Sequence, residues 1–148
     1  MRRPASRLFS LILWACSGLS VGAQDGSAPL PAYSIDGDRI LFTYIGREQP
    51  QAVHVVGNFM GWKRGHPEWR MRYLEDRQLW SLELPLSQVT ESLHQPGFYE
   101  FTFEVDGQLV DADSAAPDTI YCAGHGRRYT IPELASRGQS PAAPGRGP

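Results

Sequence analysis

The sequence predicts an all-β fold, a sandwich of about seven to eight short antiparallel strands. Three observations support it. Apolar residues recur at every second position, short clusters of turn-forming residues separate these runs, and no stretch keeps a 3.6-residue apolar period over a helical length. The segment from Pro85 to Leu93 has room for a turn or two of helix at most. A small β-barrel is the competing architecture.

Alternation is clearest over residues 99–105, where four apolar side chains face one side and three polar ones the other. Trp80 is in phase with Leu82 and Leu84, so it is assigned to the core. Earlier alternating runs cover residues 40–45, 53–56 and 69–73. Each run is expected to be a strand with one buried face.

A tight hairpin is expected directly after residues 99–105. Asp106-Gly107 lies between two strand-like runs, and a type I′ turn needs positive φ at both of its central residues. Leu109-Val110 should therefore run back antiparallel. A last strand from Arg128 to Ile131 stops at Pro132, which has no backbone N–H to donate to a sheet.

One folded domain is expected, over residues 37–132. The residues before and after it are small, polar and rich in proline, so residues 24–36 are interpreted as a linker and residues 133–148 as a disordered tail. The domain contains no internal repeat.

Residues 1–23 have the layout of a secretory signal peptide, with three arginines followed by a short apolar run from Leu8 to Ala15. Cleavage after Ala23 would release a periplasmic or secreted protein. The alternative is a lipobox ending at Cys16, which would leave a lipoprotein tethered to a membrane. The apolar run is shorter than the roughly 20 residues of a membrane-spanning helix, so no transmembrane helix is expected after processing.

Charge and cysteine content exclude several classes of protein. Loss of Arg2, Arg3 and Arg7 leaves 11 Lys and Arg against 16 Asp and Glu, a formal charge of −5, which argues against a nucleic-acid partner. Either processing route leaves Cys122 without an intramolecular partner, so no disulfide is expected. Cys122 is interpreted as a small buried apolar residue.

No catalytic, metal or cofactor site is predicted, and the protein is not expected to be an enzyme. Glu100 and Glu104 are roughly 13 Å apart on one strand face, too far for a glycosidase pair, and are interpreted as a solvated surface. Three aspartates share one loop without the spacing of a calcium site, and the four histidines have no paired spacing. Those aspartates are Asp111, Asp113 and Asp118.

One motif carries a family resemblance. The element Gly57-x-Phe59-x-x-Trp62 follows a strand, and downstream come Trp80-x-Leu82-x-Leu84-Pro85 and an aromatic strand ending in Val105-Asp106-Gly107. In this order the motifs resemble the glycogen-binding domains of AMP-activated kinase β subunits, isoamylases and branching enzymes. The resemblance spans roughly residues 38–131 and implies an immunoglobulin-like, early-set sandwich.

The resemblance also implies a sugar site. Gly57 would let the chain turn out of the strand, Phe59 would turn inward as an anchor, and Trp62 would lie flat against a pyranose ring. Asn58 and Trp69 are further candidate binding residues, and Arg127, or Tyr121, is a candidate substitute for the family's final-loop Asn.

Two positions depart from the family pattern. Sugar-binding members place a Lys and a second Trp where this chain has Thr102 and Leu109. The expected function is a non-catalytic carbohydrate-binding module in an exported protein, with weak binding to α-glucan or another glycan. The alternative is a protein–protein interaction module of the cell envelope whose sugar site has degenerated.

Overall fold

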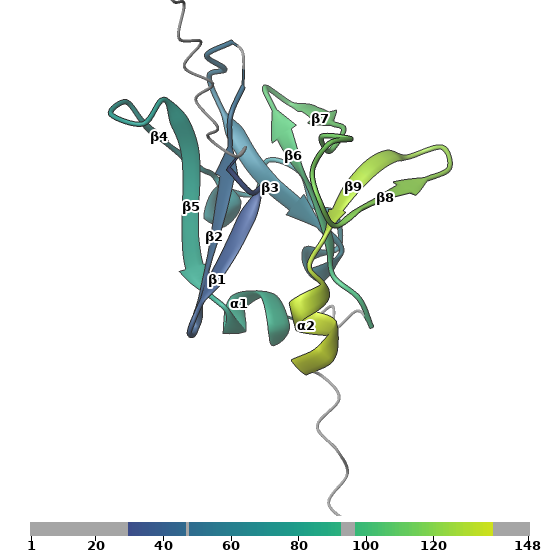
Figure 1. Ribbon diagram of the computed structural model, residues 1–148. Helices are drawn as coiled ribbons and strands as arrows, with labels where there is room; N and C mark the ends of the chain where they lie inside the picture. Colours follow the sequence, from purple (N-terminus) through teal and green to yellow (C-terminus); the bar gives the residue numbers. More distant parts are fainter. Residues whose placement is uncertain (1–29, 47, 93–96, 138–148) are drawn as a thin grey trace, which may run out of the picture.

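The computed structural model describes residues 30–46, 48–92 and 97–137. Two sheets of antiparallel strands pack face to face, which confirms the all-β sandwich (Figure 1). The described residues form nine strands, slightly more than expected. The expected signal peptide at residues 1–23 lies outside these residues, as do the first part of the linker and the tail from residue 138. No helix within the described residues is long and apolar enough to cross a membrane.

The first sheet has the strand order β1-β2-β5-β4. Its strands are β1 (Tyr33–Asp36), β2 (Arg39–Tyr44), β5 (Leu79–Pro85) and β4 (Arg72–Leu74). Residues 40, 42 and 44 of β2 pair with residues 84, 82 and 80 of β5. The two alternating runs therefore meet in register, and their apolar positions share the inner face.

The second sheet has the order β3-β6-β9-β8, with β7 also paired to β6. Its strands are β3 (Val53–Gly57), β6 (Glu100–Val105), β7 (Gln108–Val110), β8 (Thr119–Cys122) and β9 (Gly126–Thr130). Strand β3 occupies one edge of β6. Strands β7 and β9 therefore share the other edge, where β7 pairs with residues 103–105 and β9 with residues 100–101. The β8–β9 hairpin is thus attached to the sheet mainly at its base (Figure 1).

Short helical turns fill the connections. A 3-10 turn at Asn58–Met60 follows β3, and another at Pro67–Trp69 precedes β4. Helix α1 (Ser87–Thr90) follows β5, where a turn or two of helix was expected, and α2 (Pro132–Arg137) follows β9. Both helices lie at the same end of the sandwich (Figure 1).

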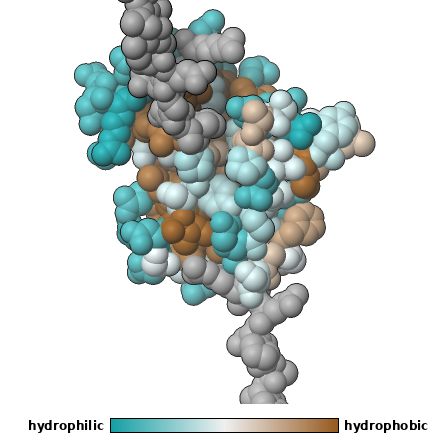
Figure 2. Space-filling view, viewed as in Figure 1, coloured by the Kyte–Doolittle hydropathy of each residue, from teal (hydrophilic) through white to brown (hydrophobic). Residues whose placement is uncertain are grey.

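Aromatic rings from both sheets make up much of the core. The Phe42 ring packs edge-on against Phe101, with ring centroids 5.0 Å apart, and Phe101 stacks on Tyr129 at 5.1 Å. Trp80 is buried, which confirms its assignment to the core. On the face seen in Figure 2, apolar side chains form separate patches divided by polar ones.

Three expected boundaries were wrong. Strand β1 lies in the segment interpreted as linker, because Tyr33 and Ile35 pack against the core. Helix α2 continues the domain beyond residue 132, since Leu134 is buried. The strand expected over residues 69–73 begins only at Arg72, because residues 67–69 form a 3-10 turn.

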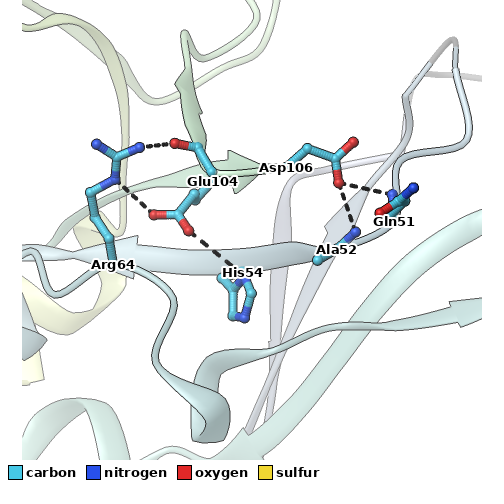
Figure 3. A network of polar contacts seen from close by, with 7 residues as sticks. Gln51, Ala52, His54, Arg64, Glu104 and Asp106 are labelled. Carbon is cyan, nitrogen blue, oxygen red and sulfur yellow. Dashed lines mark hydrogen bonds and ion pairs between the residues drawn. The ribbon is translucent and has the colours of Figure 1, made fainter.

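The hairpin at Asp106-Gly107 is confirmed, with φ angles of 46° and 80° at these two residues. The Asp106 carboxylate also accepts hydrogen bonds from the backbone N–H groups of Gln51 and Ala52, at 2.8 and 2.9 Å (Figure 3). The turn is therefore tied to the segment that leads into β3.

Candidate functional site

The loop over residues 58–66 leaves β3 and lies over the outer face of the second sheet, the face turned away from the first sheet. It begins at Gly57, where an added Cβ would be 2.5 Å from the Phe59 ring and 2.7 Å from the Glu100 carbonyl oxygen. Phe59 is fully buried in the core. The expected inward anchor is confirmed, and Gly57 provides the space that this anchor needs.

Trp62 is held in the loop by its backbone and by one cation. Its φ is 56°, a left-handed conformation uncommon for a bulky residue, and its N–H donates to the Gly57 carbonyl at 2.9 Å. The Arg128 guanidinium carbon lies over the indole, 5.5 Å from its centroid. The indole remains partly exposed while Arg128 is buried. A cation over an aromatic face is attractive, so this contact orients the ring.

Glu100 lies beside Arg128 on the outer face and is only 8% exposed. Burial raises the pKa of its carboxyl group, and the charge of Arg128 opposes that rise. The half-buried Cys122 thiol is 4.0 Å from Glu100 Oε1. The interpretation of Glu100 as a solvated residue was therefore wrong.

Glu104 is also buried, at 4% exposed, so the same interpretation was wrong for it. Arg64 Nε is 2.8 Å from Glu104 Oε2, and the Arg64 guanidinium also donates to the Gly107 carbonyl. His54 Nδ1 lies 4.0 Å from the other carboxylate oxygen (Figure 3). The loop of residues 58–66 thus covers the sheet and is anchored to it by an ion pair.

The Asn58 side chain hydrogen-bonds to backbone groups. Its Nδ2 donates to the Phe98 carbonyl at 2.9 Å, and its Oδ1 accepts from the Glu100 N–H at 3.0 Å. These two bonds join the start of the loop to the start of β6. Both ends of the Asn58 amide are therefore engaged within the protein.

Trp69 does not present a ring to solvent. It is 4% exposed, with its centroid 5.2 Å from that of Phe59 and 6.4 Å from that of Phe42. The expectation that Trp69 helps Trp62 to hold a ligand is corrected, because Trp69 is a core residue.

Arg127 lies next to Arg128 on β9, so its side chain leaves the opposite face of the strand. Its Nη1 donates to Thr119 Oγ1 at 3.3 Å, and no contact to Trp62 joins it to the loop. The cation beside Trp62 is instead Arg128. The alternation of side chains along the strand would have indicated this. Tyr129 is a core aromatic, so its neighbour Arg128 must face the other way.

The two positions that depart from the family pattern behave differently. Thr102 is fully buried and its hydroxyl donates to the Val110 carbonyl, so it is inaccessible to a ligand. Leu109 pairs with Glu104 and Ile120 pairs with Arg128, which places both apolar side chains on the outer face. Both are partly exposed. The outer face therefore presents Trp62 together with aliphatic surface.

Acidic and sulfur-containing side chains do not gather into a metal site in the part of the chain described: no group of three or more His, Cys, Asp or Glu is placed to hold an ion. In the acidic loop, Asp113 is used locally, since its carboxylate accepts from the Ala115 N–H at 2.9 Å. This is an Asx-type turn that shapes the loop.

No protein-family model matches the chain, and no curated protein matches it either. A role is therefore argued from the geometry of the site.

Proposed function

We propose that the protein is a non-catalytic carbohydrate-binding module and that the Trp62 indole is its platform. The observation that carries the proposal is a partly exposed indole with Arg128 over one face, on a residue whose backbone N–H donates to the Gly57 carbonyl. A pre-oriented ring binds a ligand with little loss of side-chain entropy.

The chemistry of a sugar suits this surface. Pyranose rings present C–H faces that stack on aromatic faces by dispersion. Arg128 takes one face of the indole, so a sugar would stack on the other. Leu109 and Ile120 extend the apolar surface on the same side of the sheet.

The resemblance of Gly57-x-Phe59-x-x-Trp62 to glycogen-binding domains favours α-glucan as the ligand. Thr102 and Leu109 replace the Lys and the second Trp, so the site lacks half of the family's stacking and hydrogen-bonding groups. We therefore expect weak binding, with a dissociation constant on the order of millimolar.

Tryptophan fluorescence titration of the full chain with maltoheptaose and β-cyclodextrin tests the proposal, with NMR titration for weak binding. Saturable binding in the wild type and its loss in Trp62→Ala are expected. Trp69→Phe, a conservative change in the core, is the matched control and should bind as the wild type does. A folded wild type that binds neither ligand overturns the α-glucan proposal.

A protein-docking role is the second candidate, and edge strand β8 favours it. Tyr121 on this strand is 70% exposed and Ile120 is partly exposed, while the outer edge of β8 is unpaired among the described strands. Exposed edges accept added strands. A photo-crosslinking residue at position 121 should then give one discrete adduct in cells, absent when the same residue is placed at Glu75. No position-specific adduct would remove this candidate.

Export forms part of both candidates. The proposed signal peptide gives a mature protein beginning at Gln24, whereas lipidation gives one beginning at Cys16. Mass spectrometry of the protein recovered from the envelope distinguishes these masses. An intact Met1 in all of the recovered protein would contradict export through either route.

A further inference from the structure

A cleft lies between the two sheets, away from the Trp62 loop. Its volume is about 530 Å³, and its walls come from the end of β2, the residues before β1, and the segment between β7 and β8. None of residues 58–66 lines it. Its size falls within the range of roughly 300–1,000 Å³ that is usual for small-molecule sites.

Aromatic rings from both sheets line this cleft. Tyr44 of β2 has its ring centroid 5.1 Å from that of Phe103, and Phe103 lies 5.8 Å from Tyr129. Val110 adds aliphatic surface beside them. The lining therefore offers both apolar contact and π faces to a bound molecule.

Among the described residues, the charged groups at this cleft are all acidic. Asp111 and Asp113 line it, and no Lys, Arg or His is among the described residues of its wall. Two neighbouring clefts have the same character: one of about 300 Å³ is lined by Asp118 and Glu133, and one of about 280 Å³ by Glu48 and Asp106. Within the part of the chain that the structure describes, neither has a basic residue in its lining.

Local contacts hold the polar groups of the main cleft in place. The Asp113 N–H donates to the Tyr129 hydroxyl at 3.1 Å. A Cβ at Gly126 would be 2.0 Å from Asp111 Oδ1, so the glycine leaves the space that this carboxylate occupies. Burial raises the pKa of Tyr44 and of Tyr129, which keeps both hydroxyls protonated at neutral pH. The site therefore combines neutral phenol rings with carboxylates.

We propose that this cleft binds a small organic cation, an ammonium or guanidinium group carried on an apolar body. The cation would lie near Asp111 and Asp113 and against the tyrosine faces, and the apolar body against Ile45 and Val110. An anion would meet two carboxylates with no compensating cation among the described wall residues, and a neutral apolar molecule would gain nothing from them. This site is separate from the proposed sugar platform.

Three probes of similar shape and different charge test the proposal on the full chain: 2-phenylethylammonium, 2-phenylethanol and 3-phenylpropionate. Amide NMR shifts report where each binds, and calorimetry reports its affinity. The ammonium is expected to bind saturably, about ten-fold more tightly than the alcohol, with shifts centred on Val110, Asp113 and Tyr129. The carboxylate is expected not to bind. Added salt should weaken ammonium binding.

Variants distinguish the contribution of charge to ligand binding from the contribution of packing. Asp113→Asn keeps the acceptor for the Ala115 N–H and should weaken ammonium binding several-fold while leaving binding of the alcohol unchanged. Glu75→Gln removes an equal charge from the β4–β5 turn and should change neither, and Trp62→Ala should leave both intact. The proposal is overturned if the ammonium fails to bind, if all three probes bind alike, or if the shifts lie away from the cleft.

Discussion

At Gly57 the absence of a Cβ atom allows the chain to leave β3 as it does. The residue has φ −149° and ψ 168°, an extended conformation that any residue adopts, so its importance is steric. Phe59 turns back under the strand and the Glu100 carbonyl closes the other side. The glycine is needed for the space that it leaves empty.

We expect Gly57→Ala to destabilise the fold by about 2–3 kcal/mol, because the added Cβ overpacks a rigid core. Gly97→Ala is the matched control. Apart from its chain neighbours, no atom of the described residues lies within 4 Å of a Cβ there, so the change should stay within about 0.5 kcal/mol. Urea unfolding measures both, and equal stabilities for the two variants would contradict the steric argument.

Glu100 should give the stability of the fold a pH dependence. Its pKa in the folded protein is raised above the ordinary value of 4.5, so folding favours the protonated form. The free energy of unfolding contributed by this group is thus greatest at acidic pH and falls as pH rises from about 4.5 through the raised pKa. Glu100→Gln should remove that fall.

Urea unfolding at several pH values measures this dependence. Relative to the wild type, Glu100→Gln is expected to gain stability between pH 4 and pH 7. Glu83→Gln, which removes an exposed carboxylate on β5, is the control for a general charge effect. A wild-type and a Glu100→Gln profile that stay parallel would refute the assignment.

At the scale of elements, the loop of residues 58–66 turns an apparently solvated sheet face into a second, smaller buried layer. Val56, Thr102 and Glu104 are all buried on that face. The ion pair between Arg64 and Glu104 fixes the loop there, two residues after Trp62. The position of the indole therefore depends on a salt bridge that does not itself touch it.

Arg64→Ala should destabilise the fold by about 1–2 kcal/mol, since it leaves the Glu104 carboxylate buried with a weaker partner. It should also speed amide hydrogen exchange across residues 58–66. Arg39→Ala breaks an exposed ion pair with Glu83 and is the control, with a cost of at most about 0.5 kcal/mol. Unchanged exchange in the loop of Arg64→Ala would show that the loop is held by other contacts.

Alternation predicted the strands and the inner faces, because a period of two is set by local geometry alone. It did not predict what covers the other face of a strand. Glu100 and Glu104 alternate with apolar residues, as solvated residues do, yet both are buried. Glu104 pairs with Arg64 of the loop, and Glu100 lies beside Cys122 and Arg128 of the β8–β9 hairpin. Arg128 was missed for a similar reason: its neighbour Arg127 was chosen by loop position, whereas strand parity decides which arginine reaches Trp62.

For the whole molecule, α2 completes one end of the sandwich. Leu134 on this helix is 2% exposed and belongs to the core, and the Tyr33 hydroxyl donates to Glu133 at 2.6 Å. The bond joins the first described strand to the last described helix. Residues that resembled a tail thus contribute to closing the core.

Leu134→Ala is expected to lower the free energy of unfolding by about 2–4 kcal/mol, the usual cost of a cavity in a core. Ala135→Gly, also on α2 but outside the core cluster, is the control, with a cost of about 1 kcal/mol from helix propensity. Thermal and urea unfolding measure both. A loss no larger for Leu134→Ala than for Ala135→Gly would place α2 outside the cooperative core.

The strand order of the two sheets also has a kinetic consequence. Position 42 pairs with position 82 in one sheet, and position 55 with position 103 in the other. Each sheet therefore closes a long loop before it gains its hydrogen bonds, so folding should take on the order of milliseconds to seconds rather than microseconds. Strand β3 of the second sheet lies in the chain between β2 and β4 of the first, so no single cut separates the two sheets, and the protein should fold as one unit.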